Sequence, residues 1–317
     1  MRMPKPRGGL SEWTVARLGA SAPDVALGPA PAADSWDDEA IALWTLHELS
    51  YRGFEDATDA GEWDPEVLVV RHRLESDLEA RLRARWPGAD LDPADVPAAL
   101  ETVVAEDDGP SLADHVRRRA TSDEVLELLR QRSIYHLKES DPVAWVVPRL
   151  PVRAKAALME LQYDEYGDGD PNRLHHHLFA QGLVAVGLRS EYGAYVDDAL
   201  PETLELNNAV SLFGLHRRLR GAAVGHLAAF EMTSSLPSRK MVQGLDRLGL
   251  DGPMAAYYDE HVEADAIHEH LASQDICGTL AEDEPDQAPE ILFGAWTCLD
   301  LEARFATALL EQWDVGS

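Results

Sequence analysis

The pattern of apolar and polar residues predicts a chain built almost entirely from helices. From residue 37 onward, apolar side chains recur at helical spacing, in a stripe that begins with Ile41 and Trp44. The pair Asp64-Pro65 marks another helix start, because proline is favoured at the first helical position. The predicted helices cover residues 37–51, 65 to 83 or 86, 92–106, 111–119, 122–138, 151–165, 171–187, 202–235, 238–248, 252–273 and 286–313, and the one short strand candidate covers 143–147.

This pattern predicts an all-α fold, a multi-helix bundle with additional N-terminal helices. Residues 1–36 are rich in Pro, Ala and Gly without a sustained apolar period, so we expect an extended or disordered tail. Residues 37–120 are expected to form accessory helices packed on the core or on a dimer partner, since their broad apolar faces need a surface to bury against. Residues 121–317 would form the main bundle.

One predicted helix carries a candidate set of metal ligands. His261, Asp265 and His268 are spaced i, i+4 and i+7, which places them within an arc of roughly 60° on an α-helix. Two imidazoles and a carboxylate on one stripe suit a borderline transition metal. A solvated acidic helix is the competing interpretation, because further acidic residues lie around the same helix.

Three more residues complete the candidate donor set. Glu165 ends one predicted helix, and His175 opens the next within the triplet at residues 175–177. Successive helical positions point about 100° apart, so one or two of the three histidines can face a site and the rest would lie at the surface. Glu231 interrupts a strongly apolar run, where burying a carboxylate is expensive unless a cation compensates it.

The donor set predicts two metals in a helical bundle. Three imidazoles and three carboxylates are too many for one facial triad and suit two ions that share a bridging carboxylate, for which we expect Glu231. Ligation rich in oxygen and free of thiolates favours iron or manganese over structural zinc. The paired Glu-x-x-His motifs of ferritin-like di-iron proteins are missing, so a different bundle is expected.

The composition limits the classes of partner that we expect the protein to bind. Lys and Arg total 28 against 57 Asp and Glu, a formal charge of −29, which argues against nucleic acid and anionic membrane as partners. No window approaches the roughly 20 apolar residues of a membrane span, and no signal peptide is evident. The two cysteines are a weak basis for disulfides, and we expect a cytoplasmic protein.

The order Glu…His…Glu…His-x-x-x-Asp-x-x-His resembles the haem-oxygenase-like di-iron oxidases, also called iron-containing redox enzymes. The likeness covers roughly residues 37–313. It includes the sequence segments Leu46–Phe54, Asp164–Gly167, Ser211–Gly221, Glu231–Pro237 and Glu260–His268. The resemblance implies a haem-oxygenase-like bundle without haem over residues 121–317, two Fe(II) ions, which Mn could replace as a non-native substitute, and O2 as co-substrate.

The resemblance also implies the chemistry. Family members N-oxygenate amines, cleave C–C bonds of amino acids or fatty acids, or desaturate them. Glu139 matches a position that adds a carboxylate near the metals in N-oxygenating relatives, so we expect N-oxygenation of a small amine or amino acid in a biosynthetic pathway, by a homodimer. Candidates for supporting contacts around the ligands are Tyr163, Tyr166, His216 and His226.

Two other functions stay open at this point. A non-catalytic helical protein could bind or buffer metal, or dock a partner through its acidic surface. A thiaminase-like hydrolase would keep the bundle, although its usual cysteine nucleophile has no clear counterpart here.

Overall fold

The computed structural model describes residues 1–19, 27–88 and 95–314, apart from the side chains of residues 263–266. Within these ranges the chain is helical and forms no β-strand, which confirms the all-α prediction. The α-helices are α1 (Gly9–Leu18), α2 (Trp36–Glu48), α3 (Pro65–Arg85), α4 (Val96–Ala105), α5 (Leu112–Arg118), α6 (Ser122–His136), α7 (Asp141–Ala144), α8 (Val152–Glu165), α9 (His175–Ala185), α10 (Pro201–Leu215), α11 (Arg220–Leu248), α12 (Pro253–His270), α13 (Thr279–Asp283) and α14 (Ala288–Gln312). Short 3-10 segments are η1 (Asp59–Trp63), η2 (Val147–Arg149), η3 (Gly167–Gly169), η4 (Val196–Asp198), η5 (Arg217–Leu219) and η7 (Pro285–Gln287), and η6 (Leu271–Gly278) is a π-helix.

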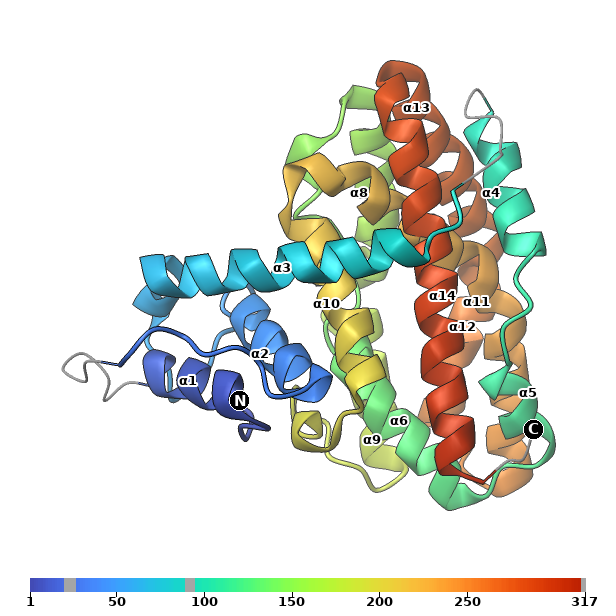
Figure 1. Cartoon of the computed structure of the whole chain (residues 1–317). Helices are drawn as coiled ribbons and strands as arrows, with labels where there is room; N and C mark the ends of the chain where they lie inside the picture. The colour runs from blue at the N-terminus through green and yellow to red at the C-terminus, as the bar shows by residue number, and fades with distance from the viewer. Residues whose placement is uncertain (20–26, 89–94, 315–317) are drawn as a thin grey trace.

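Helix α11 lies at the centre of the bundle. It packs against α14, α12 and α5, and Figure 1 shows α11, α12 and α14 running side by side. Gly225 of α11 and Gly294 of α14 allow the close approach, since a Cβ on Gly225 would lie 1.9 Å from the carbonyl oxygen of Ile291. The small residues of α11 therefore set the distance between the two longest bundle helices.

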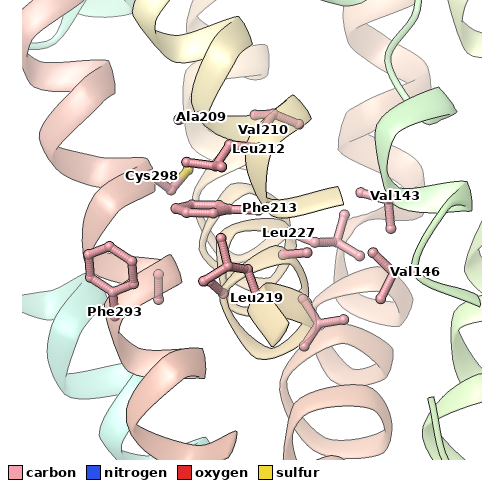
Figure 2. Close-up of a cluster of buried hydrophobic side chains, with 14 of the residues drawn as sticks. Val143, Val146, Ala209, Val210, Leu212, Phe213, Leu219, Leu227, Phe293 and Cys298 are labelled. Atoms are coloured by element: carbon pink, nitrogen blue, oxygen red, sulfur yellow. The ribbon is translucent and has the colours of Figure 1, made fainter. Parts of the chain in front are cut away.

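A cluster of apolar side chains fills the space between α10, α11 and α14. Figure 2 shows Phe213 of α10 between Phe293 and Leu227, with Val143 and Val146 further along the same cluster. The rings of Phe213 and Phe293 pack edge to face at 5.8 Å between centroids, an arrangement that aromatic pairs favour. Val143 thus belongs to the core through helix α7 and not through the strand expected at 143–147.

The accessory helices pack on the bundle. Helix α2 lies on α10, α4 on α14 and α5 on α11, while α3 runs across the bundle between α2 and α4 (Figure 1). Ion pairs fasten α3 to α14, with Arg85 Nε 2.8 Å from Asp300 Oδ2 and Arg83 Nη2 2.8 Å from Glu290 Oε2. None of the helices in the described ranges combines the length and apolar character that a membrane crossing requires.

The expectation of a loose N-terminal tail is wrong for the segment that forms α1. Leu10 and Leu18 of this helix are fully buried. Its N-terminus is capped from α2, because the Asp38 carboxylate accepts hydrogen bonds from the backbone N–H groups of Leu10 and Ser11 at 3.1 and 2.8 Å. This cap comes from a residue 27 positions away, so local sequence could not reveal it.

The helix boundaries near the centre also differ from the prediction. The helix expected over 202–235 is divided by η5 into α10 and α11, and α11 then continues through Pro237 to Leu248. An internal proline removes one backbone donor and usually ends a helix. Here α5, α12 and α14 surround α11, and this packing keeps the helix continuous.

Candidate metal centre

Five separate parts of the chain bring the candidate ligands together. Glu139 follows the end of α6, and Glu165 and His175 close α8 and open α9. Glu231 lies in α11. His261 and His268 lie two turns apart on α12, a separation of about 10 Å along the helix axis.

These side chains form two adjacent groups. Glu139, His175 and His261 form the first, and Glu165, Glu231 and His268 form the second. In each group one potential ligand atom per residue lies within 4.8 Å of the others. All are buried except His261, which is partly buried. Each group therefore offers three donors in a space that one metal ion could occupy.

Glu165 lies between the two groups. Its Oε1 is 3.1 Å from Nδ1 of His175 and 3.9 Å from Nδ1 of His268. The carboxylate of Glu231 approaches His268, with 3.4 Å between Oε2 and Nδ1. The geometry thus favours Glu165, and not the expected Glu231, as the carboxylate that could bridge two ions.

Hydrogen bonds to residues outside the two groups orient two of the imidazoles. Nδ1 of His261 lies 2.8 Å from the carbonyl oxygen of Tyr257, which leaves Nε2 directed to Glu139. Nε2 of His268 lies 2.7 Å from Oδ2 of Asp164, which leaves Nδ1 for the second group. A histidine that ligates a metal commonly donates its other N–H to a carboxylate or carbonyl in this way.

The carboxylates are held as well. The hydroxyl of Tyr257 donates to Glu139 at 3.0 Å, and Nδ1 of His136 lies 2.9 Å from the same carboxylate. The Ser140 hydroxyl donates to Oε2 of Glu165 at 2.8 Å. Both groups therefore have fixed side chains before any ion binds.

The pKa shifts in the centre show that its buried carboxylates favour positive charge nearby. Burial lowers the pKa of His175, but the Glu165 carboxylate outweighs burial and raises it to about 9. Burial likewise lowers the pKa of His268, and the hydrogen bond and charge of Glu231 raise it to about 9. Burial raises the pKa of Glu231 above its usual range. Protons on imidazoles thus balance carboxylates that a divalent cation could balance instead.

Two further observations fit a metal. Nδ1 of His175 has no hydrogen-bond partner among the described residues, although Glu165 is close by. A cavity of about 10 Å³ opens between Glu139, Glu165, Glu231 and His261, enough for about one water-sized sphere. A small cavity lined by three carboxylates and one imidazole, drawn from both groups, is the kind of space that bound metal could occupy.

Comparison with known proteins identifies the family. The family model described as iron-containing redox enzyme matches residues 126–303. The chain belongs to this family. The match covers the predicted ligands in α8, α9, α11 and α12 and also Glu139, and it confirms the resemblance found in the sequence.

Solved structures support the fold of this iron-containing redox enzyme. A CADD-like protein of unknown function from Nostoc punctiforme is 14% identical and superposes with a TM-score of 0.50, covering 75% of this chain and 97% of that chain. At this identity the likeness concerns the fold alone. No curated protein matches the chain. Family membership makes the chain an iron-containing oxidoreductase.

The structure divides the stripe expected on α12. His261 belongs to the first group and His268 to the second, so the two imidazoles would serve different ions. Asp265 was expected between them, and its side chain lies outside the described residues. Glu139, expected as an extra carboxylate beside the metals, is a full member of the first group.

The four residues expected to support the ligands lie elsewhere. Nε2 of His216 is 2.8 Å from Glu75, and the ring of His226 packs on Phe213. Tyr166 donates to Asp141, and Tyr163 is exposed. In their place the structure has His136, Ser140, Asp164 and Tyr257, which lie next to the ligands or three to four residues before one. Their positions in the sequence, next to a ligand or three to four residues before one, are the signal by which sequence analysis could have found them.

A larger cavity adjoins the first group. It has a volume of about 250 Å³, and its lining includes Glu139, His261 and residues 109–113. Phe230, Met241 and Leu299 contribute apolar walls. This is slightly below the usual size for drug-sized ligands, so the cavity suits a small organic molecule.

Proposed function

We propose that this iron-containing redox enzyme is an O2-dependent, non-haem di-iron oxygenase that N-oxygenates a small amine or amino acid. The observation that carries the proposal is the pair of adjacent carboxylate and imidazole groups with Glu165 between them. An isolated metal buffer would need neither this pairing nor a cavity of about 250 Å³ opening onto one of the groups.

Six residues of the chain would ligate the two irons. Glu139, His175 and His261 would hold one iron, and Glu231 and His268 the other, with Glu165 shared. When bound, two ferrous ions would supply the electrons and the Lewis acidity for O2 activation. The outer contacts from Tyr257 and Asp164 would keep the imidazoles in the tautomer that presents a lone pair inward.

The larger cavity would receive the organic substrate. Apolar walls exclude water and hold the substrate where the first group can act on it. Arg132 and Glu302 also line the cavity as a bidentate ion pair, with N···O distances of 2.7 and 2.6 Å. This pair adds two charged side chains to the cavity lining.

Substrate nitrogen must lose its proton before it reacts. An ammonium entering the cavity would meet the carboxylate of Glu139, whose Oε1 already takes part in a hydrogen bond with Nδ1 of His136. Both side chains line the cavity, and the tautomer of His136 with an unprotonated Nδ1 would accept a proton there. If Glu139 serves as an iron ligand, His136 is the remaining acceptor beside the substrate.

Glu139 is the reason for preferring N-oxygenation. As a member of the first group it adds a third carboxylate to the centre, in keeping with what the resemblance to N-oxygenating relatives implied. Oxidative C–C cleavage or desaturation of an amino acid or fatty acid is the alternative chemistry on the same centre. It would use the same ligands and would give different products.

Isotope labelling separates these outcomes. The protein is loaded anaerobically with Fe(II), mixed with candidate amines and amino acids, and exposed to 18-O2, and products are read by mass spectrometry. We expect label in a hydroxylamine or nitro product. An unlabelled alkene or a chain-shortened product would move the assignment to the alternative chemistry. Absence of any O2-dependent product, with full iron loading, would favour metal storage.

A further inference from the structure

A short turn connects the metal centre to the accessory helices. Residues 137–140 join α6 to α7, and two consecutive residues of this turn serve the centre. Glu139 belongs to the first ligand group, and Ser140 donates to Glu165, which lies between the groups. The position of this one turn therefore affects both groups.

Lys138 directs its ammonium away from the centre and toward α2. Its Nζ forms an ion pair with Oε1 of Glu48, the last residue of α2. The side chains are 2% and 0% exposed. The ammonium also lies 4.4 Å from the ring centroid of Tyr51, within the range of a cation–π contact. A charge this deeply buried has to be paired, so the ion pair constrains where Lys138 can be.

The segment after α2 holds the turn at its two ends. Nη2 of Arg52 donates to the carbonyl oxygen of Leu137 at 3.1 Å and lies 3.6 Å from Oδ2 of Asp141. Glu48 and Arg52 thus contact the turn at residue 138 and on both sides of it. Residue 48 lies well outside the residues 126–303 that the family model matches.

We propose that Glu48 is a positioning residue for the metal centre, acting through Lys138 on Glu139 and Ser140. The inference rests on the metal centre proposed above. Without the Glu48 carboxylate, the buried ammonium of Lys138 would have to move toward water or another acceptor. The turn would move with it, and the accessory helices would no longer set the ligand geometry.

The test measures metal binding and not turnover. Full-length apoprotein is titrated anaerobically with Co(II), and binding is followed by calorimetry and by ligand-field absorption. Glu48→Gln and Lys138→Met should each weaken at least one of the two Co(II) equivalents by about 10-fold or more, the usual effect of losing an outer contact. Each should also change the ligand-field spectrum. The double variant should bind Co(II) no more weakly than the single variant with the lower affinity, because both substitutions remove the same ion pair.

A matched control separates positioning from general loosening. Glu205 of α10 is also buried, and it pairs with Arg85 of α3 at 3.3 Å, so it joins the accessory helices to the bundle away from the turn. Glu205→Gln should lower the melting temperature while leaving Co(II) affinity and spectrum unchanged. If Glu48→Gln does not fold, Glu48→Asp keeps the charge, shortens the side chain, and should show the same loss to a smaller degree.

The outcomes are distinct. Parental Co(II) affinity and spectrum in folded Glu48 and Lys138 variants would overturn the positioning role while leaving the metal centre intact. Equal weakening by Glu205→Gln would also overturn it, because the effect would then be global. Failure of the unmodified chain to bind Co(II) at the centre would refute the proposed function, and the positioning role with it.

Discussion

Metal binding should release protons from His175 and His268. Both imidazoles have a pKa of about 9, because neighbouring carboxylates outweigh the effect of burial. A metal takes the neutral imidazole, so each ring has to lose its proton on binding. The perturbation is therefore the pH at which the apoprotein is titrated.

The magnitude follows from the two pKa values. At pH 7 a group with a pKa of about 9 is ~99% protonated, so filling both groups should release about two protons from these imidazoles. At pH 9 each ring is about half protonated, and the release should fall to about one proton. Well below pH 9, the overall binding constant for the two ions should rise ~100-fold per pH unit, since two protons leave.

Calorimetry gives the proton count directly. Co(II) is titrated into apoprotein at one pH in buffers with different ionisation enthalpies, and the slope of the observed enthalpy gives the protons released. Asp164→Asn is the control, because it removes one of the negative charges that raise the pKa of His268 and should reduce the release above pH 8. Release well below one proton at pH 7, or a pH-independent binding constant, would refute the reasoning.

Four further outcomes follow from the same site. The pKa of His268 is raised above its unfolded value of 6.5, so the stabilisation that its proton gives the apoprotein is complete below pH 6.5 and is lost toward pH 9. The melting temperature of the apoprotein should therefore fall between pH 6.5 and pH 9. A constant melting temperature over that range would contradict this. His268→Ala or Glu231→Ala should reduce bound iron from nearly two equivalents and abolish O2-dependent turnover while the helical circular dichroism survives; full iron loading would exclude them as ligands. Glu139→Gln keeps the shape and should slow product formation by ~10-fold or more, with the second group still loaded; unchanged kinetics would exclude a role in the reaction. Deleting residues 1–120 should give insoluble protein, because α2, α4 and α5 cover α10, α14 and α11; a soluble and active truncation would show that the bundle is independent.

Local signals in the sequence were enough for most of the helices. Asp64 caps α3 through the N–H groups of Glu66 and Val67, and Pro65 occupies the first helical position, as the dipeptide predicted. The cap and the proline are adjacent in the sequence, which is why sequence reasoning could find this helix start.

The grouping of the ligands could not be predicted. An arc on a helical wheel gives the direction of a side chain and ignores its height along the axis. His261 and His268 share a direction but are separated by two turns, so they reach different groups. Which carboxylate lies between the groups depends on how α8 meets α9 and α12, and that arrangement follows from packing between distant segments.

Long-range contacts also explain what the sequence missed. Asp38 caps α1 from another helix, and Glu48 pairs with Lys138 across 90 residues. Neither contact leaves a periodic or local motif. A buried charge is visible in a sequence only when its surroundings are apolar, as with Glu231, and its partner is not visible at all.

Three buried carboxylates in one centre raise the question of how the chain folds before iron binds. Burying Glu139, Glu165 and Glu231 uncompensated would cost several kcal/mol per charge. The protonated forms of His175 and His268 offset two of these three charges in the apoprotein, since their pKa values of about 9 keep them protonated at neutral pH. Metal ions can then replace protons in a centre that is already assembled. The ammonium of Lys138 is kept out of this balance by its pairing with Glu48, so it does not compete with metal for the carboxylates.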